Sequence, residues 1–205
     1  MTRFYRSACL GVRILSRLVV RVKIIGAENV PLTGGLIIAA NHVSYFDPPV
    51  LGSFAPREVH FFAKRTLFHY PGFGAVIRAL NAIPVSRDSI DREALENAVA
   101  VVGRGDCLVV FPEGHRSLSG VMLPFRWGLG MIAQRAGCPI VPVYIHGLNR
   151  VSRCLVGQER AAVVFGPPLP ADWVKTLPPT REGYNQVIEA VKEHILQLRD
   201  RFLTG

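Results

Sequence analysis

The feature that most constrains the fold of this chain is a repeated alternation of short apolar runs with longer amphipathic stretches. The short runs are rich in β-branched residues, which favour strands. They occupy residues 21–25, 36–40, 59–63, 82–86, 107–111, 139–145 and 161–165. Helical stretches lie between them at residues 48–55, 66–80, 89–105 and 125–137. This alternation predicts an α/β fold with a largely parallel central sheet flanked by helices.

The C-terminal region has the pattern of an amphipathic helix over residues 180–202. Its apolar face would hold Val187, Val191, Ile195, Leu198 and Phe202. The Pro-rich segment 167–179 before it is interpreted as a surface crossing and not as a domain boundary. A chain of 205 residues can bury one substantial core but is short for two domains. We therefore expect one α/β domain over residues 21–205.

Residues 1–20 are predicted to contain a short N-terminal amphipathic helix. Arg13, Arg17 and Arg21 recur at intervals of four, so a continuous helix would align them on one stripe. Apolar residues cover much of the remaining surface: Leu10, Ile14, Leu15 and Leu18. Two interpretations remain open, a helix packed on the domain and a helix lying in a membrane interface. Arginines interrupt the apolar region, so we expect neither a signal peptide nor a transmembrane span.

The charge of the chain favours anionic partners. It has 24 basic and 15 acidic residues, a formal net charge of +9, which suits phosphorylated substrates or acidic lipid headgroups. Nucleic acid is not expected, because the basic residues do not alternate with stacking aromatics in a recognisable domain pattern. The cysteines lack the spacing of metal ligands, so the sequence predicts buried free thiols and no metal. They are Cys9, Cys107, Cys138 and Cys154.

Polar residues gather where the predicted strands end. They are His42, Asp47, Lys64, Arg87, Glu113, Gly114 and Arg116. Ligands of open α/β sheets bind at the carboxyl ends of the strands. Taken singly, each charged residue is explained as exposed surface, and Asp47 before Pro48 is also a favourable helix N-cap. Taken together, a histidine and carboxylate beside basic groups suit a phosphorylated substrate that carries a hydroxyl.

Four ordered blocks between residues 26 and 147 carry a family resemblance. The first pairs His42 with Asp47, with four residues between them, and the third and fourth are residues 111–117 and 139–143. The second consists of Lys64, Leu67, Pro71, Gly74 and Arg87. In order and spacing these blocks resemble the glycerolipid acyltransferase family, which includes the 1-acylglycerol-3-phosphate acyltransferases. Two departures are visible: His115 stands where the family has Thr, and the N-terminal region is shorter than the apolar helix pair of several relatives.

The resemblance implies an O-acyltransferase of phospholipid biosynthesis. The donor would be an acyl thioester, acyl-CoA or acyl carrier protein, and the acceptor the free hydroxyl of 1-acylglycerol 3-phosphate, giving phosphatidic acid. His42 would act as general base, with Asp47 holding its imidazole in the useful tautomer. The nucleophile belongs to the substrate, so the resemblance implies no metal and no resident cofactor.

For the acceptor site, the resemblance implies that Arg116, Lys64 and Arg87 hold the phosphate through charge-assisted hydrogen bonds. Glu113 and the turn at Gly114 would shape this site and order its arginine. The enzyme would lie on the cytoplasmic face of a membrane, peripheral or monotopic, as at the bacterial inner membrane, with an anionic lipid surface as partner.

Other functions remain open at this point. The same chemistry could act on glycerol 3-phosphate, another lysophospholipid or a lyso-aminolipid. A thioester hydrolase would use the same base on water but would not need a basic acceptor pocket. A non-catalytic lipid-binding protein of this fold would be expected to have lost His42 or Asp47, and both are present.

Overall fold

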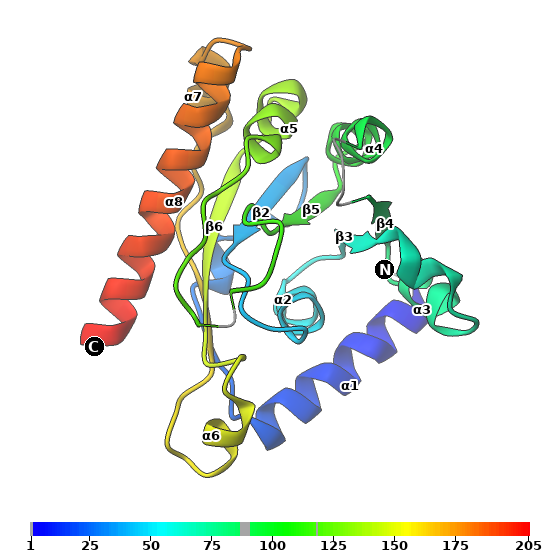
Figure 1. Ribbon diagram of the computed structural model, residues 1–205, viewed down its shortest axis with the longest axis vertical. Coiled ribbons are helices and arrows are strands. Elements are labelled where there is room, and N and C mark those ends of the chain that lie inside the picture. Colours follow the sequence, from blue (N-terminus) through cyan, green and yellow to red (C-terminus); the bar gives the residue numbers. More distant parts are fainter. Residues whose placement is uncertain (1, 87–90, 118) are drawn as a thin grey trace.

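The computed structural model describes residues 2–86, 91–117 and 119–205 (Figure 1). They form a seven-stranded sheet in the order β1-β7-β6-β2-β5-β3-β4. Its strands are β1 Lys23–Ile25, β2 Leu36–Ala40, β3 Val59–Lys64, β4 Ala82–Val85, β5 Cys107–Val110, β6 Ile140–His146 and β7 Ala162–Phe165. Each predicted apolar run coincides with one of these strands to within two residues at either end, and the predicted α/β fold class is confirmed.

Neighbouring strands are parallel, except that β7 runs antiparallel to β6. β2 pairs with both β5 and β6, and all of its residues are buried. A strand covered on both faces needs apolar side chains in both directions, which explains its unbroken sequence LIIAA. The residues after Ala40 therefore emerge in the middle of the sheet, at its carboxyl edge.

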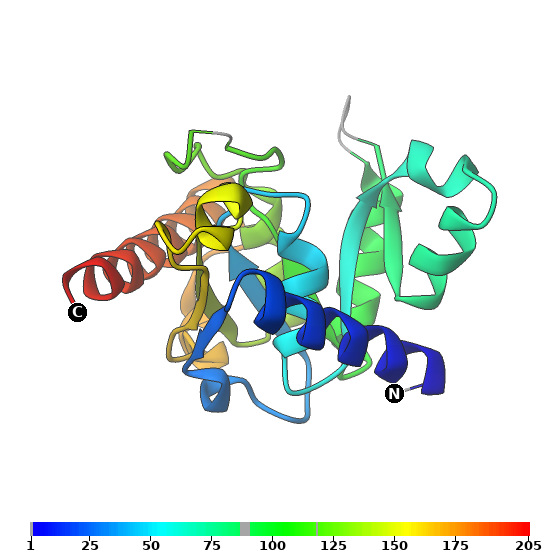
Figure 2. The same cartoon turned by 90° about the horizontal axis from the view of Figure 1, so that it is seen from below.

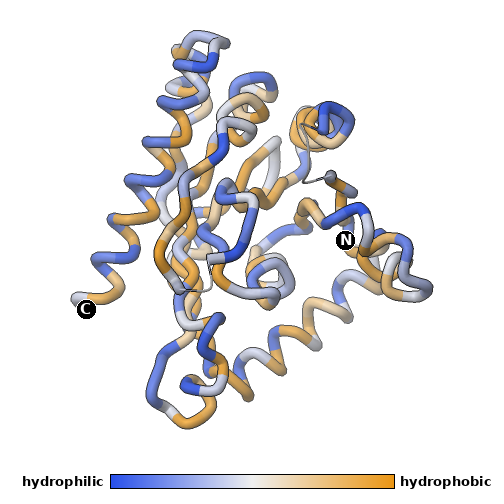
Figure 3. The backbone as a smooth tube through the Cα atoms, in the orientation of Figure 1, coloured by the Kyte–Doolittle hydropathy of each residue, from blue (hydrophilic) through white to orange (hydrophobic). Residues whose placement is uncertain are grey.

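Helices cover both faces of the sheet (Figures 1 and 2). One face is covered by α4 Arg92–Gly103, α5 Gly128–Ala136 and the long α8 Arg181–Thr204. On the other face, α1 Arg3–Val19 packs on α2 Asp47–Phe54. The hydropathy-coloured tube shows alternating apolar and polar turns along α8 (Figure 3). Four of its five predicted face residues are buried and Phe202 is partly buried, so the predicted helix is confirmed.

Four connections differ from the prediction. The helix expected over residues 66–80 is broken into a 3-10 helix, η2 Arg65–His69, and α3 Phe73–Ala79. The break falls at Pro71, which has no N–H to donate, and at Gly72, whose φ is 75°. The Pro-rich crossing contains a short helix, α7 Ala171–Thr176. Two further short helices were not predicted: η1 Ala27–Asn29 and α6 Val151–Leu155.

α1 has a packed side and an exposed side. Tyr5, Cys9 and Ser16 are buried, and the Tyr5 hydroxyl accepts a hydrogen bond of 3.1 Å from the Val59 N–H. The exposed apolar residues are Phe4, Leu10, Ile14, Leu15 and Leu18. The helix is thus both part of the core and the carrier of an outward apolar surface.

The arginines of this region do not form the predicted stripe. α1 ends at Val19, and Arg21 has a φ of 49°, so Arg21 lies outside the helix. The guanidiniums of Arg13 and Arg17 lie over the Phe54 ring, at 6.0 and 5.5 Å from its centroid. Arg13 Nε also donates to the Ser53 carbonyl. Both arginines therefore turn toward α2.

Two other sequence predictions concern cysteines and membrane spans. Each of the four cysteines is free and buried, which confirms the prediction of buried thiols. In residues 2–86, 91–117 and 119–205, no helix combines the length and apolar character needed to cross a bilayer.

Candidate active site

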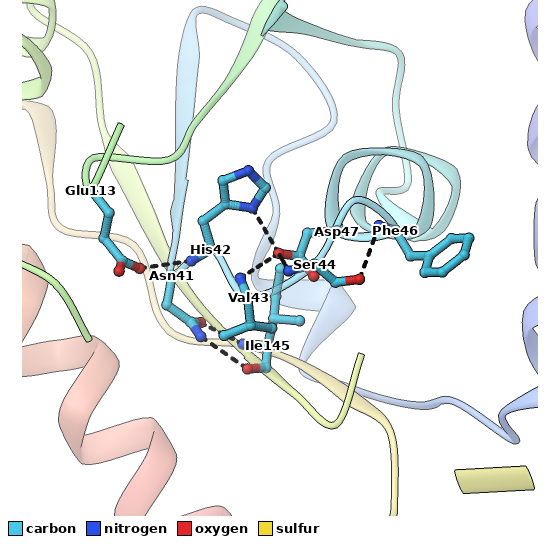
Figure 4. A network of polar contacts seen from close by, with 8 residues as sticks. All are labelled: Asn41, His42, Val43, Ser44, Phe46, Asp47, Glu113 and Ile145. Atoms are coloured by element: carbon cyan, nitrogen blue, oxygen red, sulfur yellow. Dashed lines mark hydrogen bonds and ion pairs between the residues drawn. The ribbon is translucent and has the colours of Figure 1, made fainter. Parts of the chain in front are cut away.

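The candidate site begins where β2 ends. The Asn41 amide donates to the Ile145 carbonyl (3.0 Å), and its oxygen accepts from the Ile145 N–H (2.7 Å), which ties the chain to β6 (Figure 4). His42 follows directly. Its N–H donates to Glu113 Oε1 (2.7 Å), and its carbonyl accepts from the Ser117 N–H (2.7 Å). The backbone of a loop residue is thus held from both sides, as in a sheet.

His42 and Asp47 are in direct contact (Figure 4). His42 Nδ1 lies 2.7 Å from Asp47 Oδ2. The same oxygen accepts from the N–H groups of Val43 (2.6 Å) and Ser44 (2.7 Å), so the carboxylate is fixed by three donors. Because a carboxylate accepts, Nδ1 of the neutral ring carries the proton and Nε2 holds the lone pair. The ring stacks on Phe111, with centroids 4.2 Å apart, which sets its plane.

Asp47 does not cap α2, contrary to the local sequence pattern. An N-cap side chain accepts from the N–H groups that follow it, whereas Asp47 Oδ2 accepts from residues that precede it. Oδ1 is buried and has no hydrogen-bond partner in the described part of the chain. Pro48 and Pro49, which follow Asp47 in the first turn of the helix, have no N–H groups that would need a cap. The carboxylate is left to orient His42.

Glu113 joins the loop after β2 to the loop after β5. It is buried; its Oε1 accepts from the His42 N–H and its Oε2 from the Leu123 N–H (2.8 Å). Burial raises the pKa of Glu113, and the two N–H groups oppose this effect. From the family resemblance, Glu113 is expected to order an arginine. In the structure both its oxygens hold the backbone of the two loops, so it positions His42.

Cationic side chains line the same cavity as His42: Lys64, Arg116 and Arg126. Lys64 is the last residue of β3, and the Arg116 guanidinium carbon lies 3.3 Å from the centroid of the Tyr45 ring. Arg87, also predicted to bind the acceptor, lies outside the described residues. Arg126 is not among the predicted site residues. Nothing in its local sequence distinguishes it from a surface arginine, because only the path of the loop after β5 brings it to the cavity.

The cavity has a volume of about 1070 Å³ and extends from His42 to the inner side of α1. This size is typical of the largest small-molecule pockets. Its apolar lining includes Tyr5, Cys9, Val12, Val76, Ile77, Leu129 and Ile132. α1 supplies part of the cavity wall, which the sequence pattern of this helix does not predict.

The family model described as Acyltransferase matches residues 21–146, which include every described site residue from His42 to Arg126. The chain belongs to the acyltransferase family. The resemblance inferred from the four ordered blocks is therefore confirmed. α1 and α8 lie outside the matched range.

This acyltransferase has named relatives. It is 26% identical over 199 residues to the 1-acyl-sn-glycerol-3-phosphate acyltransferase of Bacillus subtilis (strain 168), covering 96% of this chain and 98% of that protein. It is 30% identical over 165 residues to the protein of the same name from Streptococcus pneumoniae, covering 79% of this chain and 60% of that protein. The crystal structure of the 1-acyl-sn-glycerophosphate acyltransferase PlsC from Thermotoga maritima matches with a TM-score of 0.69 and 25% identity, covering 92% of this chain and 78% of that one.

Proposed function

We propose that this acyltransferase transfers a fatty acyl group from an acyl thioester to the free hydroxyl of 1-acylglycerol 3-phosphate, forming phosphatidic acid for phospholipid biosynthesis. The observation that carries the proposal is the His42–Asp47 pair, in which a buried carboxylate holds the imidazole at 2.7 Å in the wall of a largely apolar cavity. The names of the curated relatives support this acceptor.

In the proposed mechanism, His42 Nε2 takes the proton of the acceptor hydroxyl as its oxygen attacks the thioester carbonyl carbon. The tetrahedral intermediate collapses when the carbon–sulfur bond breaks, and the imidazolium returns the proton to the leaving thiolate. Asp47 stabilises the imidazolium and keeps the ring in its tautomer. The attacking oxygen comes from the substrate, so this scheme uses no nucleophilic side chain of the protein.

The phosphate of the acceptor would be held by Arg116 and Lys64, which line the cavity with His42. A guanidinium donates two parallel hydrogen bonds to phosphate oxygens, and Tyr45 holds the Arg116 group by stacking on its face. Arg87 remains a predicted contributor from outside the described residues. Gly114, with a φ of 73°, makes the turn that brings Arg116 to the cavity.

The apolar part of the cavity supports a long acyl chain as a substrate group. Burial of an acyl chain against apolar walls is favourable, whereas a polar ligand would find few hydrogen-bond partners there. We propose acyl-CoA or acyl carrier protein as the donor, since both present the same thioester. No metal or resident cofactor takes part in the proposed steps.

We further propose that the enzyme attaches peripherally to the cytoplasmic face of a membrane through the exposed side of α1. Leu10, Ile14 and Leu18 are exposed there. Inserting such side chains into an interface is favourable, and the net charge of +9 favours anionic lipid. The phosphatidic acid product is itself a membrane lipid.

The test is an acceptor-by-donor panel with purified protein, in which products are identified by mass spectrometry. The acceptors are 1-acylglycerol 3-phosphate, glycerol 3-phosphate, an uncharged 1-acylglycerol, a lysophosphatidylcholine and a lyso-aminolipid, each with acyl-CoA and with acyl carrier protein thioester. Phosphatidic acid is expected as the main product. Preferential acylation of another acceptor, or release of free fatty acid alone, would contradict the proposal.

A further inference from the structure

Arg126 stands at the end of the loop that begins after β5, and it packs against the start of that loop. Its N–H donates to the Pro112 carbonyl (2.8 Å), which closes the loop on itself. Its side chain crosses Gly114, where an added Cβ would lie 2.8 Å from Arg126 Nε and 3.1 Å from its Cδ. Gly114 therefore leaves the space in which the side chain of Arg126 lies.

The guanidinium of Arg126 has a neutral partner. Its Nη2 lies 2.9 Å from His115 Nε2. A guanidinium can only donate, so Nε2 accepts and the imidazole in this contact is uncharged, with its proton on Nδ1. His115 thereby directs Arg126 without neutralising it. Glu113, the acid closest in sequence, bonds to backbone N–H groups instead.

Arg126 shares the cavity with Gly114, Arg116 and His42. Over the described stretches of the chain, neither Arg116 nor Arg126 forms an ion pair with a carboxylate. Two guanidiniums that line one cavity, with no carboxylate of the described residues paired to either, produce a positive potential suited to a doubly charged anion. Each can donate paired hydrogen bonds to phosphate oxygens, which matches a phosphomonoester in particular.

We infer that Arg126, oriented by His115 across Gly114, is a second phosphate-binding arginine, and that the phosphomonoester of the acceptor binds between Arg116 and Arg126. The inference rests on the proposed function for the identity of the acceptor. It also gives His115 a role, although the related block has Thr at this place: His115 positions Arg126.

The role of Arg126 in phosphate binding can be tested without turnover. Calorimetry measures the equilibrium binding of a short-chain 1-acylglycerol 3-phosphate in the absence of donor. Arg126→Gln is expected to weaken binding about tenfold or more, the usual scale for a lost charge-assisted hydrogen bond. Arg126→Lys keeps the charge but not the planar guanidinium, so its acceptor affinity should lie between those of the unmodified protein and Arg126→Gln. Arg201→Gln removes the same charge from an exposed residue in the last turn of α8 and should bind like the unmodified protein.

Kinetics separates binding of the phosphate from a general structural role. The ratio of kcat/KM for 1-acylglycerol 3-phosphate to that for uncharged 1-acylglycerol should fall in Arg126→Gln, while the donor KM stays constant. His115→Thr should shift the ratio in the same direction by a smaller factor. A purely structural effect would lower both acceptors alike.

Unchanged acceptor affinity in Arg126→Gln would overturn the inference, as would a raised donor KM with intact acceptor binding. If Arg126→Gln does not fold, Arg126→Lys and His115→Thr make the same comparison, and wild-type affinity in both would overturn it. A protein that binds the phosphorylated acceptor through Arg126 but does not acylate it would refute the proposed function and leave this inference standing.

Discussion

Glu113 Oε1 accepts a hydrogen bond of 2.7 Å from the backbone N–H of His42, so a residue of the third sequence block holds the proposed base of the first. Its other oxygen holds the Leu123 N–H at 2.8 Å. One buried carboxylate thus fixes the loop after β2 against the loop after β5. The base and the proposed acceptor site are parts of one rigid unit, which keeps the imidazole at a constant place relative to the substrate hydroxyl.

Glu113→Gln should lower kcat by roughly 10- to 100-fold with a smaller change in the acceptor KM. Glutamine has one accepting oxygen and an NH₂ group, which cannot accept from the second backbone N–H. The free energy of unfolding should fall by about 1–3 kcal/mol, because a buried N–H loses its partner. Steady-state kinetics and urea unfolding measure both. A raised acceptor KM at constant kcat would place Glu113 in direct contact with the acceptor instead.

Arg116→Ala should weaken binding of the phosphorylated acceptor by about 2 kcal/mol or more, because the substitution removes charged hydrogen bonds to phosphate. The donor KM should change much less. The comparison requires both Michaelis constants, measured at saturating concentrations of the other substrate, with Arg201→Gln as a control for charge. If the donor KM rose and the acceptor KM did not, Arg116 would belong to the thioester site.

The outer side of α1 can be tested without disturbing its packed side. Leu10→Ser with Leu18→Ser should lower co-sedimentation with anionic vesicles and activity on long-chain acceptors, while activity on short soluble analogues persists. Binding by the unmodified protein should be only partly reversed by salt, which screens the charges but not the apolar contact.

The matched control changes two leucines of similar exposure elsewhere, Leu32→Ser with Leu203→Ser. This variant should bind vesicles like the unmodified protein. Equal binding by the two double variants would show that the lipid contact lies on another surface. Truncation of residues 1–20 would be a poorer test, because it also removes Tyr5 and Cys9 from the core and the cavity wall.

Asp91 should make stability depend on pH. The N–H groups of Ser86 (2.8 Å) and Ala94 (3.0 Å) stabilise its carboxylate and lower its pKa. A lowered pKa in the folded state gives a stabilisation that is complete above the ordinary Asp pKa of about 3.9. It is lost as the pH falls through the lowered value. Asp91→Ala should therefore reduce the free energy of unfolding by about 1–2 kcal/mol at neutral pH, where it also loses the N-cap of α4.

Urea unfolding at pH 7 and at steps below pH 4 measures the difference in the free energy of unfolding between the unmodified protein and Asp91→Ala. This difference should shrink as the pH falls. The control is Asp172→Ala, whose carboxylate is almost fully exposed and should matter little at either pH. A difference between Asp91→Ala and the unmodified protein that stayed constant across this range would show that the charge of Asp91 is not involved.

The strands were predictable because each is a short apolar run, and the central β2 is buried on both faces. The helix break at Pro71 and Gly72 could also have been predicted, since Pro-Gly pairs mark turns. α7 was not predicted because of the prolines around it, and Pro170 occupies its N-cap position without a side-chain cap hydrogen bond. Local pattern thus determines element type well wherever the elements are long or fully apolar.

The site was predictable only in part, because much of it depends on tertiary contacts. The spacing of His42 and Asp47 indicated their pairing, but the same sequence predicted a helix cap that the structure does not contain. No local signal connects Arg126 to Gly114, or Tyr45 to Arg116, because the loop after β5 brings these residues together. The part of α1 that lines the cavity was likewise not predictable, because the buried side of a helix has the same hydrophobic periodicity whatever it packs against.

The central claim is that His42, held by Asp47, takes the proton of the acceptor hydroxyl. The most direct measurement is the rate of phosphatidic acid formation by His42→Ala, with the fold checked by thermal unfolding and acceptor binding checked by calorimetry. A folded protein that binds the acceptor but forms no product is expected, and Asp47→Asn should retain a small residual rate, reduced roughly 100- to 10,000-fold. Turnover near the wild-type rate by folded His42→Ala would contradict the account.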